Sequence, residues 1–220
     1  MKSKSNKIAA LLAALAQEYP APICELNYTA PHELLIAARL SAQCTDKRVN
    51  AVTPELFGRF NGVCDFAAAE LREIEGIVKP CGLYKTKAAS IKAMCELLLR
   101  NHGGEIPEEM DALLALPGIG RKTANLIRGE LFGLPAIVAD THVIRLSGRL
   151  GLVPQGLKDP HKVELILREL IPPKESMAFC HRLVLHGRRV CKARKADCCA
   201  CILRPECDTG VSNDACYFET

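Results

Sequence analysis

The residues with the clearest chemical potential are cysteines near the end of the 220-residue chain. The stretch CKARKADCCACILRPEC contains five of them, interleaved with lysine and arginine. Four follow the spacing C-x6-C-x2-C-x5-C, and these are Cys191, Cys198, Cys201 and Cys207. A zinc ribbon usually has two C-x2-C pairs, and ferredoxin spacings also differ from this one. The spacing alone leaves zinc, an iron-sulfur cluster and disulfides open.

The same segment concentrates positive charge. Between His181 and Cys207 there are seven Lys or Arg residues against two acidic residues, a local charge of +5, whereas the whole chain carries +4. A patch of this kind is typical of proteins that bind a polyanion such as nucleic acid. Charge alone fits a basic, solvated surface equally well.

A second motif with chemical potential is LPGIGRKTAN, residues 116–125. Its glycines separate a short helical segment from a second one that begins at Arg121. Glycine permits the positive φ of a tight turn and lets the backbone approach a ligand closely. The N–H groups at Gly118, Gly120 and Arg121 lack helical acceptors, so with the helix dipole they suit a bound phosphate. The glycine spacing alone also fits an ordinary turn between helices.

The elements that must position these residues are predicted to be helices. Helical periodicity recurs along the chain, strand-like alternation is scarce, and no linker is long or low in complexity. The sequence therefore predicts an all-α protein, in which Pro54 splits or kinks one helix. The predicted helical segments are 31–43, 46–60, 85–102, 110–116, 121–132, 140–150, 160–170 and 175–186.

The first residues, MKSKSNKIAALLAALAQ, have two interpretations. Lysines followed by an apolar run ending in Ala-Leu-Ala are typical of a short secretory signal. Ile8, Leu11, Leu12 and Leu15, in contrast, form the stripe of an amphipathic helix, which is the preferred interpretation. No run approaches the ~20 apolar residues of a membrane-spanning helix.

LPGIGRKTAN, followed by VADTHVIRLSGRLG, resembles the helix-hairpin-helix and aspartate motif of base-excision DNA glycosylases. With the cysteine segment included, the sequence is similar to the bacterial endonuclease III family, glycosylases with AP (abasic site) lyase activity on oxidised pyrimidines. Residues 25–46, 82–88 and 185–195 also resemble family segments, so the resemblance covers nearly the whole chain. It includes the N-terminal helix, which the family keeps in the mature protein, and this argues against a signal peptide.

The resemblance implies the catalytic residues. Lys122 would attack C1′ of the damaged nucleotide, expel the base and leave a Schiff base, from which β-elimination cuts the strand on the 3′ side. Asp140 would face the lysine and support formation of the sugar cation and proton transfer. Taken alone, Lys122 also fits a simple phosphate contact and Asp140 fits a helix N-cap. A capping carboxylate can still face a cleft, so the two roles of Asp140 are compatible.

The resemblance also implies residues that handle a flipped nucleotide. Gln43 would hydrogen-bond the orphaned base, and Leu83 would act as an apolar wedge. Asp46 and His142 match positions near the lesion pocket, although an N-cap and a structural histidine are the alternatives. Cys44 replaces the alanine of the commoner motif SAQATD, and we expect it to be tolerated sterically and to be sensitive to oxidation.

For the cysteines, the resemblance implies one 4Fe-4S cluster on the four positions spaced x6-x2-x5. The cluster would shape the loop KARKAD, whose cations Lys192, Arg194 and Lys195 would contact DNA phosphates. Cys199 and Cys216 fall outside the pattern and are interpreted as bystanders. Free thiols and a labile cluster favour a reducing cytoplasm.

The implied architecture has a six-helix barrel domain at 23–135, with the helix-hairpin-helix at about 110–132. A second helical domain would combine 1–22 with 136–220 and carry the cluster loop 191–207, and DNA would lie in the cleft between the domains. The implied protein is a monomeric cytoplasmic, nucleoid-associated enzyme that acts on double-stranded DNA containing damaged bases or abasic sites, away from membranes.

The sequence leaves two alternative functions open. One is a monofunctional adenine-type mismatch glycosylase, which would share the cluster and the aspartate. The other is a non-catalytic iron-sulfur module that binds DNA or senses redox state. The pairing of Lys122 with Asp140 at the family spacing favours the bifunctional enzyme over both.

Overall fold

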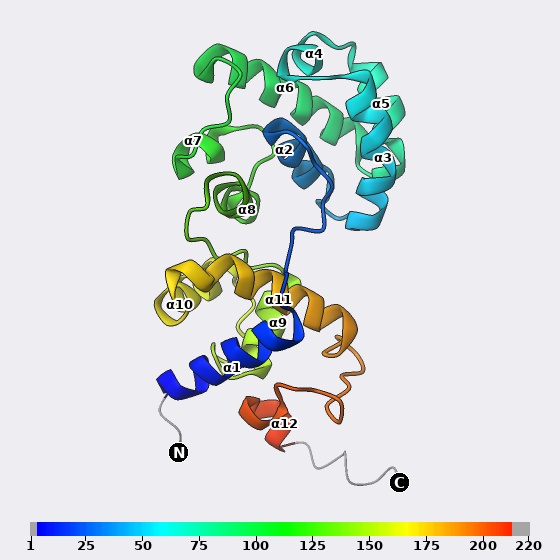
Figure 1. Cartoon of the computed structure of the whole chain (residues 1–220). Helices are drawn as coiled ribbons and strands as arrows, with labels where there is room; N and C mark the ends of the chain where they lie inside the picture. Colours follow the sequence, from blue (N-terminus) through cyan, green and yellow to red (C-terminus); the bar gives the residue numbers. More distant parts are fainter. Residues whose placement is uncertain (1–3, 213–220) are drawn as a thin grey trace. The chain divides into compact units, whose positions relative to one another are not determined.

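The structure, a computed structural model, describes residues 4–212 (Figure 1). Helices and their connections account for this range, and no β-strand occurs within it, which confirms the all-α prediction. The chain divides into two compact units. We call Cys24–Leu134 the inserted unit, and Met1–Ile23 together with Pro135–Thr220 the flanking unit. No helix among the described residues is long and apolar enough to span a membrane.

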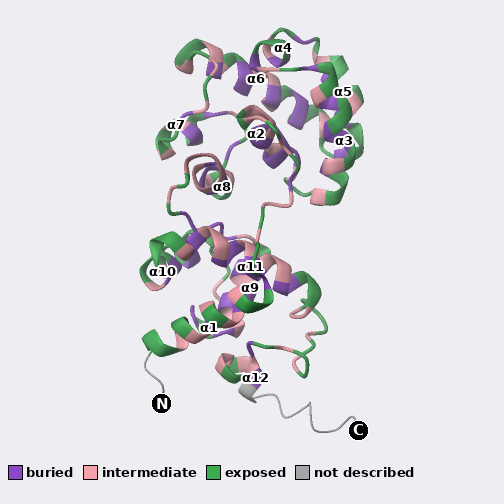
Figure 2. Ribbon diagram, in the orientation of Figure 1, coloured by how far each residue is buried: buried purple, intermediate pink, exposed green. Residues whose placement is uncertain are grey.

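The inserted unit is built around α2 and α6. Its helices are α2 (Pro31–Leu40), α3 (Asp46–Arg59), α4 (Val63–Ala68), α5 (Leu71–Val78), the 3-10 helix η1 (Lys79–Cys81), α6 (Tyr84–His102), α7 (Met110–Ala115) and α8 (Arg121–Phe132). Helix α2 packs on α3, α6 and α8, and α6 also packs on α4 and α5. Most of α2 is buried, including Leu34, Leu35, Ile36 and Leu40 (Figure 2). This explains why HELLIAARL is apolar on nearly every side.

Pro54 was predicted to split or kink this helix; α3 runs unbroken from Asp46 to Arg59, so Pro54 does not split it, and a kink there stays a prediction. The proline side chain is exposed. Buried Val49 and Leu56 anchor the helix on either side of it. Packing of both halves therefore outweighs the missing backbone hydrogen bond.

The helices α4 and α5 were not predicted from the sequence. Each is short, and α5 carries Gly76, which lowers helix propensity. Tertiary contacts stabilise them instead. Lys92 Nζ, on α6, donates to the carbonyls of Ala67 and Ala69 at the end of α4, at 2.9 and 2.7 Å.

The flanking unit collects helices from both parts of the sequence. These are α1 (Lys4–Glu18), α9 (Thr141–Arg149), α10 (Pro160–Leu170), η2 (Pro173–Glu175), α11 (Ser176–Arg189), η3 (Arg204–Glu206) and α12 (Asp208–Ser212). Helix α11 packs on both α1 and α9. The predicted stripe of α1 is confirmed, because Ile8, Leu11 and Leu15 are buried.

Candidate functional site

The turn between α7 and α8 contains two glycines, and only Gly118 has a backbone conformation that requires glycine. Gly118 has φ +81°, in the left-handed region, and a Cβ there would lie 2.8 Å from Arg39 Cδ and closer still to Nε. Arg39 is held in place because its Nε donates to Ser90 Oγ at 2.7 Å. Gly120 has φ −102° and ψ 173°, which any residue adopts, so the expected conformational need is absent there.

The N-terminus of α8 lacks a side-chain cap, since Gly120 is its N-cap residue. A Cβ at Gly120 would meet nothing within 4 Å, so the backbone is open to close approach. Lys122 lies in the first turn with its side chain exposed, and Arg121 beside it is half-buried. Uncapped N–H groups, the positive end of the dipole and two cations together make this turn suited to an anion.

Lys122 shares its surroundings with Asp46. The thiol of Cys24 experiences the charges of Glu130, Asp46 and Lys122, which places all three near it in the inserted unit. Burial is the main cause that raises the pKa of Cys24 to about 11. Asp46 is the first residue of α3 and does not cap it; the cap is Thr45, whose Oγ1 accepts from the N–H of Arg48 at 3.3 Å. The capping alternative for Asp46 is therefore wrong.

Asp140 is the N-cap residue of α9 in the flanking unit. Its Oδ1 accepts from the N–H of Val143 at 2.7 Å, so the capping interpretation is confirmed. The side chain is half-buried, and Oδ2 makes no hydrogen bond to the described residues. One carboxylate oxygen is thus committed to structure while the other remains able to act on a ligand. Lys122 belongs to the inserted unit and Asp140 to the flanking unit.

His142 has the contacts of a structural histidine. Its Nδ1 lies 3.2 Å from Nη2 of Arg145, and the same Nη2 donates to the carbonyls of Gly187 and Cys191. A Cβ at Gly187 would lie 2.6 Å from His142 Nδ1, so the glycine permits this packing. The lesion-pocket role of His142 stays a prediction.

Gln43 and Leu83 share an unusual backbone conformation. Their φ angles are 53° and 47°, and they are the two non-glycine residues with positive φ in residues 4–212. Left-handed conformation costs an L-residue about 1–2 kcal/mol, and it persists where surrounding contacts impose it. Both side chains are exposed, with Leu83 58% accessible, so an apolar side chain is held out into solvent. Such strain and exposure are typical of functional positions.

The four cysteines of the spaced pattern come together in the flanking unit. A cavity of about 340 Å³ is lined by Cys191, Cys198, Cys201, Cys207, Arg149, Arg194, Lys195 and Arg204 among others. Burial, and then the neighbouring thiols, raise the pKa of Cys201 to about 11. Within the described residues, no three His, Cys, Asp or Glu side chains converge as a single metal ion requires. The four thiols and the cationic side chains therefore line the same cavity.

Hydrogen-bond donors point at the cysteine sulfurs. Arg149 Nη1 donates to Cys191 Sγ at 3.1 Å, and the N–H of Gly210 donates to Cys207 Sγ at 3.3 Å. His186 Nε2 lies 3.3 Å from Cys201 Sγ. Donors of this kind stabilise thiolate ligands and tune the groups they bind. The donor set therefore fits an anionic sulfur site.

Cys199 and Cys216 were expected to be bystanders outside this set. Cys199 is exposed and does not line the cavity, but it is disulfide-bonded, so the expectation of a free thiol is wrong for it. Cys199 is exposed, whereas the four cysteines that line the cavity are half-buried. Cys216 lies outside the described residues.

Arg149, at the end of α9, fixes the basic loop. Its Nη1 and Nη2 donate to the carbonyls of Lys192 and Ala193, both at 2.9 Å. Lys192 and its neighbours Arg194 and Lys195 have exposed side chains. The loop is thus held through its backbone, which leaves its cations free to face a ligand. Sequence reasoning missed Arg149, because nothing local marks this helix-end arginine as a loop clamp.

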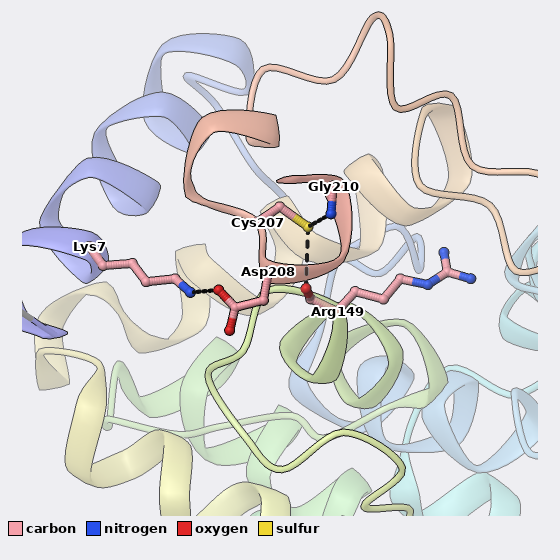
Figure 3. Close-up of polar contacts among 5 residues, drawn as sticks. All are labelled: Lys7, Arg149, Cys207, Asp208 and Gly210. Carbon is pink, nitrogen blue, oxygen red and sulfur yellow. Dashed lines mark hydrogen bonds and ion pairs between the residues drawn. The ribbon is translucent and has the colours of Figure 1, made fainter. Parts of the chain in front are cut away.

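The sulfur of Cys207, the last of the four patterned cysteines, is held by two backbone groups. Cys207 Sγ lies between the N–H of Gly210 and the carbonyl of Arg149, to which it donates at 3.2 Å (Figure 3). The next residue, Asp208, pairs with Lys7 on α1. A Cβ at Gly151, which has φ +71°, would overlap the Asp208 carboxylate, so this glycine permits the docking.

The fold and these motifs define a known class. A family model described as "HhH-GPD superfamily base excision DNA repair protein" matches residues 36–173, and the chain belongs to this family. Among its relatives, the endonuclease III of Synechocystis sp. is 42% identical over 214 residues, covering 97% of each chain. The endonuclease III of Escherichia coli K12 is 40% identical over 198 residues, covering 90% of this chain and 93% of that protein. The resemblance seen in the sequence is confirmed.

Solved structures agree with this placement. A trapped endonuclease III–DNA covalent intermediate is 41% identical, with a TM-score of 0.89, and covers 96% of this chain and 98% of that one. A thermostable thymine-DNA glycosylase has a TM-score of 0.88 at 21% identity and supports the fold alone.

Proposed function

We propose that this protein is a DNA glycosylase with AP lyase activity that removes oxidised pyrimidines from double-stranded DNA. Membership of the base excision repair family and about 40% identity to endonuclease III proteins support this activity. The observation that carries the proposal is an exposed Lys122 in the first turn of an uncapped helix, directly after the glycine turn.

The phosphate backbone would bind at two places. In the inserted unit, the N–H groups of Gly118, Gly120 and Arg121 surround the open α8 N-terminus. In the flanking unit, the exposed cations of the loop held by Arg149 contact phosphates. Contacts of this kind position the protein on DNA without reading sequence.

Lys122 is the proposed nucleophile. The Nζ lone pair attacks C1′, and the bond from C1′ to the pyrimidine breaks, its electron pair leaving with the base, which takes up a proton. Ring opening of the sugar gives an imine between C1′ and Nζ. Removal of a C2′ proton then breaks the C3′–O bond and cuts the strand on the 3′ side.

Asp140 supports the cationic character that develops at the sugar. Its Oδ1 remains in the N-cap of α9, and Oδ2 is the oxygen proposed to face the reacting sugar and to move protons. Because the cap orients the carboxylate, an isosteric amide at this position would keep the fold and lose the charge.

Gln43 and Leu83 are proposed to fill the gap that a flipped nucleotide leaves. Both residues have left-handed backbone conformations and exposed side chains. A flipped base leaves its partner base unpaired and a gap in the base stack. The amide of Gln43 suits hydrogen bonds to the partner base, and Leu83 suits the stack. Asp46, near Lys122, and His142 are proposed for the lesion pocket.

The cysteines lining the cavity fit a 4Fe-4S cluster, with Cys191, Cys198, Cys201 and Cys207 as the ligands. Support comes from a cavity of about 340 Å³, its cationic lining and the N–H donors aimed at the sulfurs. The bound cluster would supply structural cross-linking of this segment and no bond breaking. We place the activity in the cytoplasm at the nucleoid, with the inserted unit as the helix-hairpin-helix domain.

The test is borohydride trapping on a duplex with one thymine glycol. Borohydride reduces the imine to a stable amine, so a covalent protein–DNA band is expected with the wild-type protein. The band should vanish with Lys122→Gln and fall strongly with Asp140→Asn. Lys158→Gln, an exposed lysine in a loop of the flanking unit, is the charge-matched control and should trap normally.

Other outcomes separate the alternatives. Base release without a trapped band would indicate a monofunctional glycosylase and exclude Lys122 as the nucleophile. Neither release nor trapping, on several oxidised pyrimidines, would indicate a DNA-binding module without catalysis.

A further inference from the structure

A buried ammonium group joins two loops of the inserted unit. Lys87, near the start of α6, is fully buried, and its Nζ donates to the carbonyls of Leu40 and Cys81, both at 2.8 Å. Leu40 is the last residue of α2, and Cys81 is the last residue of η1. One nitrogen atom therefore holds the point where the turn 41–44 begins and the point where the segment 82–83 begins.

A lysine is a costly residue for this buried position. An ammonium group that leaves water loses hydration, which two neutral carbonyls replace only in part. Burial accordingly lowers the pKa of Lys87 below its usual value. An apolar side chain would fill the same space without this cost. Lys87 therefore contributes what core packing does not, namely two directed hydrogen bonds to two separate loops.

Side chains of α6 fasten the end of α2 at two successive residues. Arg39 Nε donates to Ser90 Oγ at 2.7 Å, and Ser90 Oγ donates to the Lys87 carbonyl at 2.9 Å. The next residue, Leu40, accepts from Lys87 Nζ. The N–H of Cys44 donates within the turn at 3.1 Å and not to Leu40, the acceptor that a continuing helix would use. The turn 41–44 thus starts from a fixed point.

The second segment is held by the same lysine on both sides of its glycine. The backbone N–H of Lys87 donates to the Leu83 carbonyl at 2.9 Å, while its side chain reaches the Cys81 carbonyl. Arg48, at the start of α3, adds a weaker link, since its Nη1 lies 3.5 Å from the Pro80 carbonyl oxygen. Leu83 therefore follows a backbone segment with little freedom to move.

Each of the two loops presents one residue with left-handed backbone. Gln43 has φ 53° and Leu83 has φ 47°. Such conformations persist where the surrounding structure imposes them. Both side chains are exposed, so their own burial does not impose the conformation. The backbone anchors on either loop do so, and Lys87 is an anchor of both.

We propose that Lys87 is the positioning residue for Gln43 and Leu83, which it holds at a fixed separation so that both side chains enter the DNA together. The inference rests on the proposed function, in which this pair fills the gap that a flipped nucleotide leaves. Because Lys87 is buried, it acts through the two loops and not on DNA. A misplacement of 1 Å can lower a rate by about 100-fold, so we expect Lys87→Met to slow base excision by about tenfold or more.

The experiment has one readout without DNA and one with it, both on the full chain. Amide hydrogen exchange of the free protein measures the mobility of residues 41–44 and 81–83. Single-turnover excision of thymine glycol from a duplex, with protein in excess, measures the rate after binding. Lys87→Met keeps the length of the side chain and removes the donors. Leu98→Ala, also fully buried on α6 but far from both loops in sequence, is the destabilising control.

Exchange should become faster in both segments in Lys87→Met and stay unchanged there in Leu98→Ala. The excision rate should fall by about tenfold or more in Lys87→Met alone. A second comparison separates positioning from general damage. In a protein that already carries Gln43→Ala and Leu83→Ala, adding Lys87→Met should leave the remaining rate unchanged, because the pair through which it acts is gone. Lys87→Gln, which keeps two N–H donors on a shorter stem, should lose less of the rate than Lys87→Met.

Several outcomes would overturn the proposal. These are unchanged exchange in either segment, an equal fall in rate with Leu98→Ala, or the same fall when the pair is already alanine. If Lys87→Met does not unfold cooperatively, Lys87→Gln decides by the same comparison in the two backgrounds. If the wild-type protein neither releases base nor forms a trapped band, the proposed function fails, while hydrogen exchange still decides whether Lys87 holds the two loops.

Discussion

Replacing Gly118 by alanine should destabilise the protein far more than the same change at Gly120. An alanine at φ +81° costs about 1–2 kcal/mol for the left-handed conformation. Its Cβ would also displace Arg39, whose Nε makes a charged hydrogen bond of 2.7 Å to Ser90. Such a bond contributes about 1.5–3 kcal/mol, so we expect a total loss of about 2.5–5 kcal/mol. That is a large share of the ~5–15 kcal/mol typical of a folded protein.

Gly120→Ala is the matched control. Its backbone is extended and its Cβ meets nothing, so the free energy of unfolding should change by less than about 1 kcal/mol. Urea unfolding followed by far-ultraviolet circular dichroism gives both values. DNA affinity should follow the opposite order from stability. In fluorescence anisotropy on a duplex with an abasic-site analogue, Gly120→Ala should weaken binding more than Gly118→Ala does, because its methyl group enters the space proposed for a phosphate.

A double-mutant cycle tests the cause. In an Arg39→Ala background the clash is absent, so Gly118→Ala should cost only the conformational part, about 1–2 kcal/mol. A loss below about 1 kcal/mol in the wild-type background, or an equal loss in both backgrounds, would refute the reasoning.

Three further changes have defined outcomes. Burial lowers the pKa of His32 below its usual 6.5, so its stabilising contribution is present above pH 6.5 and is lost as the pH falls. His32→Phe should reduce this loss of unfolding free energy, measured by urea titration at several pH values; an unchanged dependence on pH would contradict the assignment. Lys87→Met should cost about 2–4 kcal/mol by leaving two buried carbonyls unpaired, whereas exposed Lys85→Met should change stability little; equal losses would exclude the proposed tie between loops. A lysine at position 149 cannot donate to both the Lys192 and Ala193 carbonyls as the guanidinium does. Arg149→Lys should therefore speed amide hydrogen exchange in the loop 192–195 and weaken DNA binding. Unchanged exchange would show that Arg149 does not hold the loop.

Helices with strong local signals could be predicted from the sequence. Helix α8 begins at Arg121 after a glycine turn and ends before Gly133, and α2 begins at Pro31, as predicted. Helices α4 and α5 could not be predicted, because their stability comes from α6, including a lysine that reaches 25 residues along the chain to Ala67. Pro54 does not split α3 for a related reason: packing of the buried face of α3 decides the continuity of the helix.

The candidate site was predictable where a contiguous motif or a spacing carries it, as for Lys122 and the four cysteines. Residues that act through long-range contacts left no local signal. Arg149 clamps a loop more than 40 residues later, at a sequence separation of 43 from Lys192. Lys87 acts on a carbonyl 47 residues earlier. The left-handed backbone of Gln43 and Leu83 was equally hidden, because neither is a residue that prefers it.

The division of the chain has a consequence for the order in which the protein forms on the ribosome. The inserted unit is one continuous stretch, Cys24–Leu134, and can complete its core while the remainder is still being translated. Helix α1 emerges first but must wait for its partners, because Tyr19 binds Arg182 and His186, and Lys7 binds Asp208, 201 residues later. The flanking unit therefore closes last, because α1 can bury its contacts only after residues 182–208 have been synthesised.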